Sequence, residues 1–187
     1  MIKKGHTNME FQNVIESRRS IRKYKDKNVE KEKIEAMLRA ASFAPSWKNS
    51  QTARYYVVSG GKTLEEVRAS LPDFNKKNTS GAPVLIVTTI VKNISGFNND
   101  KTPSNELGNG WGYYDCGLNN MLLVLKAEEL GLATLIMGLR DEEKIRKTLN
   151  ITEEENVVSV IAVGYADISP DMPKRKDISE TAKFFEE

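Results

Sequence analysis

Residues 116–130 restrict the fold of this chain more than any other segment. They are predicted to form one helix whose apolar side chains occupy most of its circumference: Leu118, Met121, Leu122, Leu123, Val124, Leu125 and Ala127. A helix that is apolar on most sides must be buried on several of them. A chain of 187 residues has few elements to cover it, so the pattern also favours a partner subunit against one side.

Two further helices are predicted before this segment. The clearer one repeats apolar residues at i, i+3, i+4 and i+7, with charges on the opposite face: Ile34, Met37, Leu38 and Ala41. The earlier one has an apolar stripe of Phe11, Val14 and Ile15, which we expect to be buried. Asn8 is placed to cap its start.

Four apolar runs predict strands, at residues 55–59, 84–91, 133–137 and 157–165. The run 84–91 is typical of a central strand covered on both faces. Short helices are predicted around Leu64 and Val67, after Asp141, and at Phe184 and Phe185. Strands and helices alternate irregularly, without evenly spaced βαβ units, so the predicted class is α+β, with a mixed central sheet flanked by helices.

The length favours a single domain spanning residues 1–187. Within it we expect a flexible leader (1–8), a lid-like loop (92–112) and a C-terminal arm (166–187). The loop is rich in Asn, Gly, Ser and Lys, and loops of this length usually close over sites, bind ligands or are disordered. It ends in Trp111, Tyr113 and Tyr114, which either lie over a flat ligand or pin the loop to the core.

Composition argues against several classes of protein. Basic residues exceed acidic ones by only 28 − 26 = 2, which is too few for a typical nucleic-acid-binding face. Cys116 is the single cysteine, so it has no internal disulfide partner; we expect it to be packed, with a reactive thiol as the alternative. No apolar run reaches the ~20 residues of a membrane span. We expect a soluble, cytoplasmic protein without membrane or nucleic-acid partners.

Residues 18–22 (RRSIR) place three guanidinium groups close together. Arginine offers a planar fork of donors that matches a phosphate, so the cluster can act as an anion clamp. The alternative is a solvated basic end of the first helix, favoured by the helix dipole. The chain has neither a G-x-G-x-x-G after a strand nor a G-x-x-x-x-G-K-[ST] motif, and no metal-like grouping of Cys and His.

Four segments together resemble the nitroreductase family of FMN-dependent oxidoreductases. They are 18–22 (RRSIR), 45–51 (PSWKNSQ), 131–138 (GLATLIMG), and 164–165 (GY) followed by 173–176 (PKRK). The resemblance extends from about residue 9 to residue 176. It implies a nitroreductase-like fold and an intertwined homodimer, with each flavin between subunits. The family usually has proline after the Gln of the second motif, where this chain has Thr52.

The resemblance also implies which residues hold the cofactor. Arg18, Arg19, Ser20 and Arg22 would bind the FMN phosphate and ribityl chain or the pyrimidine edge. Ser46 and Asn49 would lie beside the ring, and Met137, Gly138 and Leu139 would present backbone groups to it. Lys174 and Lys176 would add phosphate contacts. Trp111, Tyr113 and Tyr114 are the candidates for the substrate pocket, and no metal is expected.

The implied reaction is ping-pong transfer of hydride from NADH or NADPH to FMN, and then to a nitroaromatic, a quinone or a similar small-molecule acceptor. No side chain is expected to act as a nucleophile or general base. One alternative is a specialised relative, such as a dehalogenase, an enoate or azoline oxidoreductase, or a flavin-degrading enzyme. Others are a non-catalytic flavin-binding redox sensor and a small RNA-binding domain, which the nearly balanced charge argues against.

Overall fold

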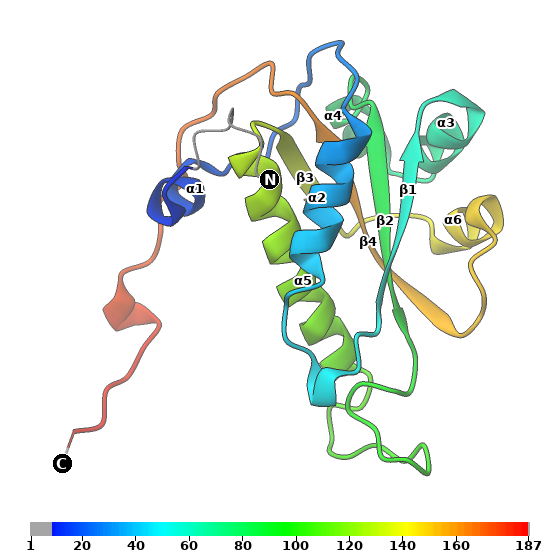
Figure 1. The fold of residues 1–187 in the computed structure, drawn as a ribbon, viewed down its shortest axis with the longest axis vertical. Coiled ribbons are helices and arrows are strands. Elements are labelled where there is room, and N and C mark those ends of the chain that lie inside the picture. The colour runs from blue at the N-terminus through cyan, green and yellow to red at the C-terminus, as the bar shows by residue number, and fades with distance from the viewer. Residues whose placement is uncertain (1–8, 187) are drawn as a thin grey trace, which may run out of the picture.

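The computed structural model describes residues 9–186, which form a central sheet with helices on both faces (Figure 1). The strands are β1 (Ala53–Ser59), β2 (Val84–Val91), β3 (Ala133–Met137) and β4 (Glu155–Gly164). The helices are α1 (Phe11–Ser17), α2 (Lys31–Ala41), α3 (Gly61–Ala69), α4 (Asp73–Asn78), α5 (Gly110–Glu129) and α6 (Glu142–Leu149). Two short 3₁₀ turns are η1 (Trp47–Asn49) and η2 (Ile178–Glu180).

The sheet has the order β1-β2-β4-β3, and every neighbouring pair is antiparallel. A parallel pairing occurs only as an isolated bridge between Ser20 and Thr134 within the described residues. The α+β class is confirmed, whereas the sheet is antiparallel and not mixed as predicted. Strand β2 is central and almost wholly buried, as its apolar run predicts.

Successive side chains of the two central strands point to opposite faces of the sheet, so the interior is divided into two cores. In β2, Leu85 and Val87 face one core, where α3 and α6 pack, whereas Val84 and Ile86 face the other. The second core contains Met37 from α2 together with the buried side of α5. Successive strand side chains point to opposite faces, so a sheet apolar on both faces needs helices on both.

Helix α5 runs along one face of the sheet beside α2 (Figure 1). Its 20 residues make it about 30 Å long. It begins at Gly110, six residues earlier than the apolar pattern predicts, and Gly131 follows its end with a positive φ of 71°. Three of its large hydrophobic side chains stay exposed in the single chain: Tyr113 is 43% exposed, Tyr114 61% and Met121 45%.

Two predictions about the ends of the chain are wrong. Phe11 is 68% exposed and Ile15 is 37% exposed, because α1 lies beside α5 at the edge of the body and buries only Val14 (Figure 1). Phe184 and Phe185 are outside any helix, and the arm instead has the 3₁₀ turn at η2. The predicted cap Asn8 lies outside the described residues, and α4, rich in polar residues, was not predicted at all.

None of the helices in residues 9–186 combines the length and the apolar character needed to span a membrane.

Candidate functional site

The arginine cluster follows α1 directly and is attached to the edge of the sheet. Arg18 is the residue that ends the helix, and Ile21 N–H donates to the Thr134 carbonyl of β3 at 3.0 Å. The Arg19 guanidinium donates back to the carbonyls of Glu16 and Arg18, at 2.5 and 2.9 Å. The cluster is therefore attached to the backbone of an edge strand and is more than the basic end of a helix.

A cavity of about 230 Å³ joins this cluster to the C-terminal arm. Its lining residues come from both ends of the chain: Arg18, Arg19, Ser20, Arg22, Pro170, Asp171, Pro173 and Arg175. Four guanidinium groups against one carboxylate give a formal charge of 4 − 1 = +3. The arm leaves β4 and passes α1 before it extends away from the body (Figure 1). Arg175 lines the cavity, whereas its neighbours Lys174 and Lys176 are not among the lining residues. The phosphate contacts predicted for these two lysines therefore remain predictions.

One arginine in this cavity has unused hydrogen-bonding capacity. The Nε atom of Arg19 is buried without an acceptor among the described residues. A buried donor of this kind costs free energy unless a partner is supplied. The cavity thus combines positive charge with a free donor, and both features fit the phosphate of FMN.

The backbone predicted to face the flavin ring follows the end of β3. Strand β3 is at the edge of the sheet, and Gly138 and Leu139 continue from it outside any helix or strand. Leu139 is 64% exposed. The same strand begins beside the arginine cluster through Thr134, so cluster and predicted ring-facing backbone share one sheet edge.

The loop that contains Ser46 and Asn49 has an unusual backbone. Lys48, Asn49 and Gln51 all have positive φ, at 48°, 55° and 48°. Left-handed conformations are uncommon for residues other than glycine, and they cluster where the surrounding structure enforces them, often at binding sites. Ser46 Oγ accepts a hydrogen bond from the Gln51 backbone N–H at 3.0 Å, and Asn49 Oδ1 accepts one from the Gln51 side-chain amide, Nε2, at 3.2 Å.

Asp115 fastens this loop to α5. It is 2% exposed, and its Oδ2 accepts both the Trp47 backbone N–H, at 3.0 Å, and the Ser95 hydroxyl, at 2.5 Å. One carboxylate therefore joins the predicted ring-side loop, the 92–109 segment and the helix. Sequence reasoning missed Asp115; the available signal was a single acidic residue near the start of a segment expected to be buried.

The three predicted pocket aromatics lie in the first turns of α5 and not in the preceding loop. The Trp111 ring lies 4.8 Å from Trp47 and 5.7 Å from Tyr114, centroid to centroid. Trp111 Nε1 donates to Asn105 at 2.9 Å, so this ring also anchors the loop. Tyr113 is 43% exposed, and its hydroxyl accepts from Asn156 at 2.9 Å. Trp47, which sequence reasoning did not select, completes the aromatic group.

The predicted site residues form two groups at opposite ends of α5. Arg19 shares a cavity of about 190 Å³ with Glu128, near the C-terminal end of the helix. The loop with Ser46 and Asn49 lies at the N-terminal end, where Trp47 meets Trp111 and Asp115 (Figure 1). A helix of 20 residues separates them by most of its length of about 30 Å. A single copy of the chain does not gather all the predicted contacts around one flavin.

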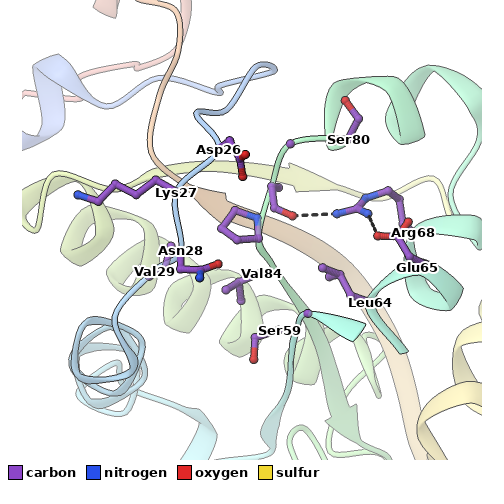
Figure 2. Close-up of a pocket in the computed structure, with 14 residues that line it drawn as sticks. Asp26, Lys27, Asn28, Val29, Ser59, Leu64, Glu65, Arg68, Ser80 and Val84 are labelled. Carbon is purple, nitrogen blue, oxygen red and sulfur yellow. Dashed lines mark hydrogen bonds and ion pairs between the residues drawn. The ribbon is translucent and has the colours of Figure 1, made fainter. Parts of the chain in front are cut away.

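A larger cavity, about 630 Å³, lies between α3 and the segments that precede α2 and β2 (Figure 2). The Arg68 guanidinium at its wall is already engaged, by the Ala82 carbonyl at 2.8 Å and by the Glu65 carboxylate. Asp26 and Glu65 place two carboxylates in the lining, opposite in charge to Arg68 and Lys27. None of the predicted cofactor residues lines it, and we assign it no ligand.

The arrangement described above agrees with a comparison against protein-family models. The model described as the Nitroreductase family matches residues 15–78 and 65–165, which is most of the chain. The chain belongs to the nitroreductase family. As a member of the nitroreductase family, it is an oxidoreductase.

Relatives and solved structures extend the nitroreductase match. The protein named "Putative NADH dehydrogenase/NAD(P)H nitroreductase" of Methanothermobacter thermautotrophicus is 31% identical over 87% of this chain and 80% of its own length. A crystal structure of a nitroreductase family protein from Clostridium difficile 630 has a TM-score of 0.78 at 25% identity, covering 94% of this chain and 98% of that one. An oxidoreductase containing FMN shares the fold, with a TM-score of 0.79 at 21% identity over 91% and 89% of the two chains.

Proposed function

We propose that this nitroreductase is an FMN-dependent NAD(P)H oxidoreductase that reduces a nitroaromatic, a quinone or a similar small acceptor by a ping-pong mechanism. The observation that carries the proposal is the cationic cavity between residues 18–22 and the C-terminal arm. It adjoins the sheet edge that continues into Gly138 and Leu139.

The chain offers groups suited to each part of the cofactor. Arg18, Arg19, Arg22 and Arg175 supply the charge and donors that a phosphate needs, and Ser20 supplies a hydroxyl. Lys174 and Lys176 are further candidates for phosphate contacts. The backbone of Met137, Gly138 and Leu139 would meet the ring, and the loop before β1 would contribute Ser46 and Asn49.

In this proposal no side chain of the protein takes part in the redox step. FMN, when bound, supplies that chemistry, accepting hydride from NADH or NADPH and passing electrons to the acceptor. The residues of the chain hold and orient the cofactor, and Trp111, Tyr113 and Tyr114 help to shape the space over it. The buried Asp115 is committed to Trp47 and Ser95, which makes it a structural anchor and not a proton carrier.

The separation of the two groups of site residues supports a homodimer as the active form. A second copy is needed to bring one loop 46–51 to the arginine cavity of the other chain. The exposed apolar side chains of α5 and of the arm are available for such an interface: Tyr114, Met121, Ile168, Met172, Ile178, Phe184 and Phe185. Exposed apolar side chains mark an interaction surface where they form a contiguous patch.

Anaerobic reduction of the FMN-loaded protein tests the proposal. We expect the purified protein to bind FMN and to lose its yellow colour on addition of NADH or NADPH, and to regain it with a quinone or a nitroaromatic. Failure to bind FMN would contradict the proposal as a whole. Binding without reduction by either nicotinamide would point to a flavin-binding sensor, and reduction without reoxidation by these acceptors would point to a specialised family member.

A further inference from the structure

Arg140 follows the predicted ring-facing backbone directly, and its side chain folds back onto it. The Nη1 atom donates to the Gly138 carbonyl at 2.7 Å. The Nη2 atom donates to the Val157 carbonyl of β4 and lies 3.8 Å from Glu142. The side chain is 19% exposed. The guanidinium thus ties the segment after β3 to the neighbouring strand.

The hydrogen bond to Gly138 acts on a peptide group that no regular element holds. The Gly138 carbonyl and the Leu139 N–H are the two ends of one peptide, and residues 138–140 belong to no helix or strand. Outside the β3–β4 ladder, neither the Gly138 nor the Leu139 N–H has a backbone acceptor within residues 9–186. Within residues 9–186, Arg140 is therefore the side chain that holds the carbonyl end of this peptide.

A cationic donor on a carbonyl also changes the other end of the peptide. Hydrogen bonds in series polarise one another, and bonds from a charged donor are stronger than neutral ones. Polarisation by Arg140 makes the Leu139 N–H a stronger donor. It does so without placing the charged group itself on the exposed side, where Leu139 lies.

We propose that Arg140 is a positioning residue that orients and polarises the Gly138–Leu139 peptide, so that the Leu139 N–H favours the reduced flavin. The inference rests on the proposed function, because it needs FMN beside this backbone. Two-electron reduction increases the negative charge on the flavin ring, so a stronger donor and a nearby cation stabilise the reduced form more than the oxidised one.

The test uses the full-length, FMN-loaded protein and the variants Arg140→Gln and Arg140→Lys. The midpoint potential of the bound FMN is measured by anaerobic titration against a redox dye. For Arg140→Gln we expect the preference for reduced over oxidised FMN to fall about tenfold, a shift of about 30 mV to more negative potential for a two-electron couple. Arg140→Lys keeps the charge and loses the fork, so its potential should lie between the two.

A measurement without flavin tests the positioning role separately. The ¹³C chemical shift of the Gly138 carbonyl and the ¹⁵N shift of the Leu139 amide in the apo-protein should both change in Arg140→Gln, because the carbonyl loses its charged donor. Wild-type shifts for both nuclei in Arg140→Gln would show that Arg140 neither holds nor polarises the peptide, and would overturn the inference.

Arg146→Gln is the matched control. Arg146 is 16% exposed, and its guanidinium binds the Glu155 carbonyl at 2.9 Å and the same Glu142 at 2.8 Å, but it does not touch Gly138. We expect it to lower stability and leave the potential unchanged. An equal shift of the potential in Arg140→Gln and Arg146→Gln, or a wild-type potential in Arg140→Gln, would overturn this inference and leave the proposed function standing. If the wild-type protein binds no FMN, the proposed function falls and this inference falls with it.

Discussion

Arg18 illustrates how the meaning of a single residue depends on its surroundings. By position it ends α1, where a basic side chain is ordinary. In the folded chain it also lines a cavity with three further arginines, one of which comes from the arm. Four like charges around 230 Å³ repel one another, so the cavity is better explained by an anionic ligand than by helix capping.

Replacing Arg18 should therefore weaken FMN binding. We expect Arg18→Ala to lose about 1–3 kcal/mol of affinity, the usual value of a charge-assisted contact, measured by fluorescence titration of the apo-protein with FMN. Arg39→Ala is the control, because Arg39 is an exposed arginine on α2 that lines none of the cavities described here. Equal affinities for wild type and Arg18→Ala would remove Arg18 from the phosphate site.

The burial of Cys116 predicts that the folded protein loses stability at alkaline pH. Burial raises the pKa of its thiol from 9.0 to about 11. Above pH 9 the unfolded chain releases this proton while the folded chain keeps it, so the stabilising contribution is complete below pH 9 and is lost as the pH rises toward 11. The loss should reach about 2 kcal/mol near the upper end of this window.

Denaturant unfolding of wild type and Cys116→Ala between pH 8 and pH 11 checks this prediction. The variant loses some packing at every pH, but the difference between the two proteins should shrink as the pH rises. Tyr24, whose pKa burial also raises, has no interaction with Cys116, so its contribution is the same in both proteins and cancels in the comparison. A constant difference across the range would contradict the assignment to Cys116.

At the scale of elements, the start of α6 follows local rules closely. Asp141 precedes the helix, and its Oδ1 accepts the Lys144 backbone N–H at 3.1 Å. Asp at this position satisfies a helix N–H that otherwise has no partner. Arg146 and Lys147 in the last turn complement the dipole, and Asn150 after it has the left-handed conformation expected at a helix end.

Removal of this cap should lower the melting temperature. We expect Asp141→Ala to destabilise the protein and Asp141→Asn to retain most of its stability, since asparagine caps about as well. The Lys144 N–H and ammonium group lower the pKa of Asp141. Its contribution is therefore present above its unfolded pKa, near 4, and is lost as the pH falls through the folded value. Identical melting curves for all three proteins at pH 7 would show that the cap is dispensable.

The loop 46–51 shows an element that local rules do not explain. Its three positive φ angles occur at Lys48, Asn49 and Gln51, none of which is a glycine. The conformation is enforced from outside, by Asp115 on the Trp47 N–H and by the contact between Trp47 and Trp111. Strain held by tertiary contacts near predicted ligand groups agrees with a binding role for Ser46 and Asn49.

At the scale of the whole molecule, the single chain leaves the end of its arm exposed. The arm extends beyond α1, and Phe184 and Phe185 are 76% and 93% exposed (Figure 1). Side chains of this size contribute about 1.5–3 kcal/mol each when they are fully buried. A second copy that covers the arm would also supply the missing loop 46–51 to the arginine cavity.

The dimer has a direct test. We expect the wild-type protein to sediment at about 2 × 21.0 = 42.0 kDa in analytical ultracentrifugation. The double variant with Phe184→Ser and Phe185→Ser should be monomeric at protein concentrations at which the wild type is still dimeric. It should also bind FMN more weakly. Phe74→Ser is the control, since Phe74 is 54% exposed on α4, far from the arm in the chain. A monomeric wild-type protein that binds FMN fully would contradict the proposed assembly.

Patterns of short range were enough to predict most of the elements. The periodicity of α2, the uninterrupted apolar run of β2, the cap of α6 and the glycine after α5 each depend on residues a few positions apart. The α+β class and the family followed from these elements and from four short motifs. Local sequence therefore contained the list of parts and the chemistry of the proposed flavin site.

The positions of those parts in space depended on contacts between distant residues. The sequence did not indicate that Asp115 would hold Trp47 and Ser95, or that Arg175, between Lys174 and Lys176, would line the cavity. It also did not place the two groups of site residues at opposite ends of α5. Burial and hydrogen-bond partners are properties of the packed chain, and no pattern within a short window specifies which distant segment will supply them.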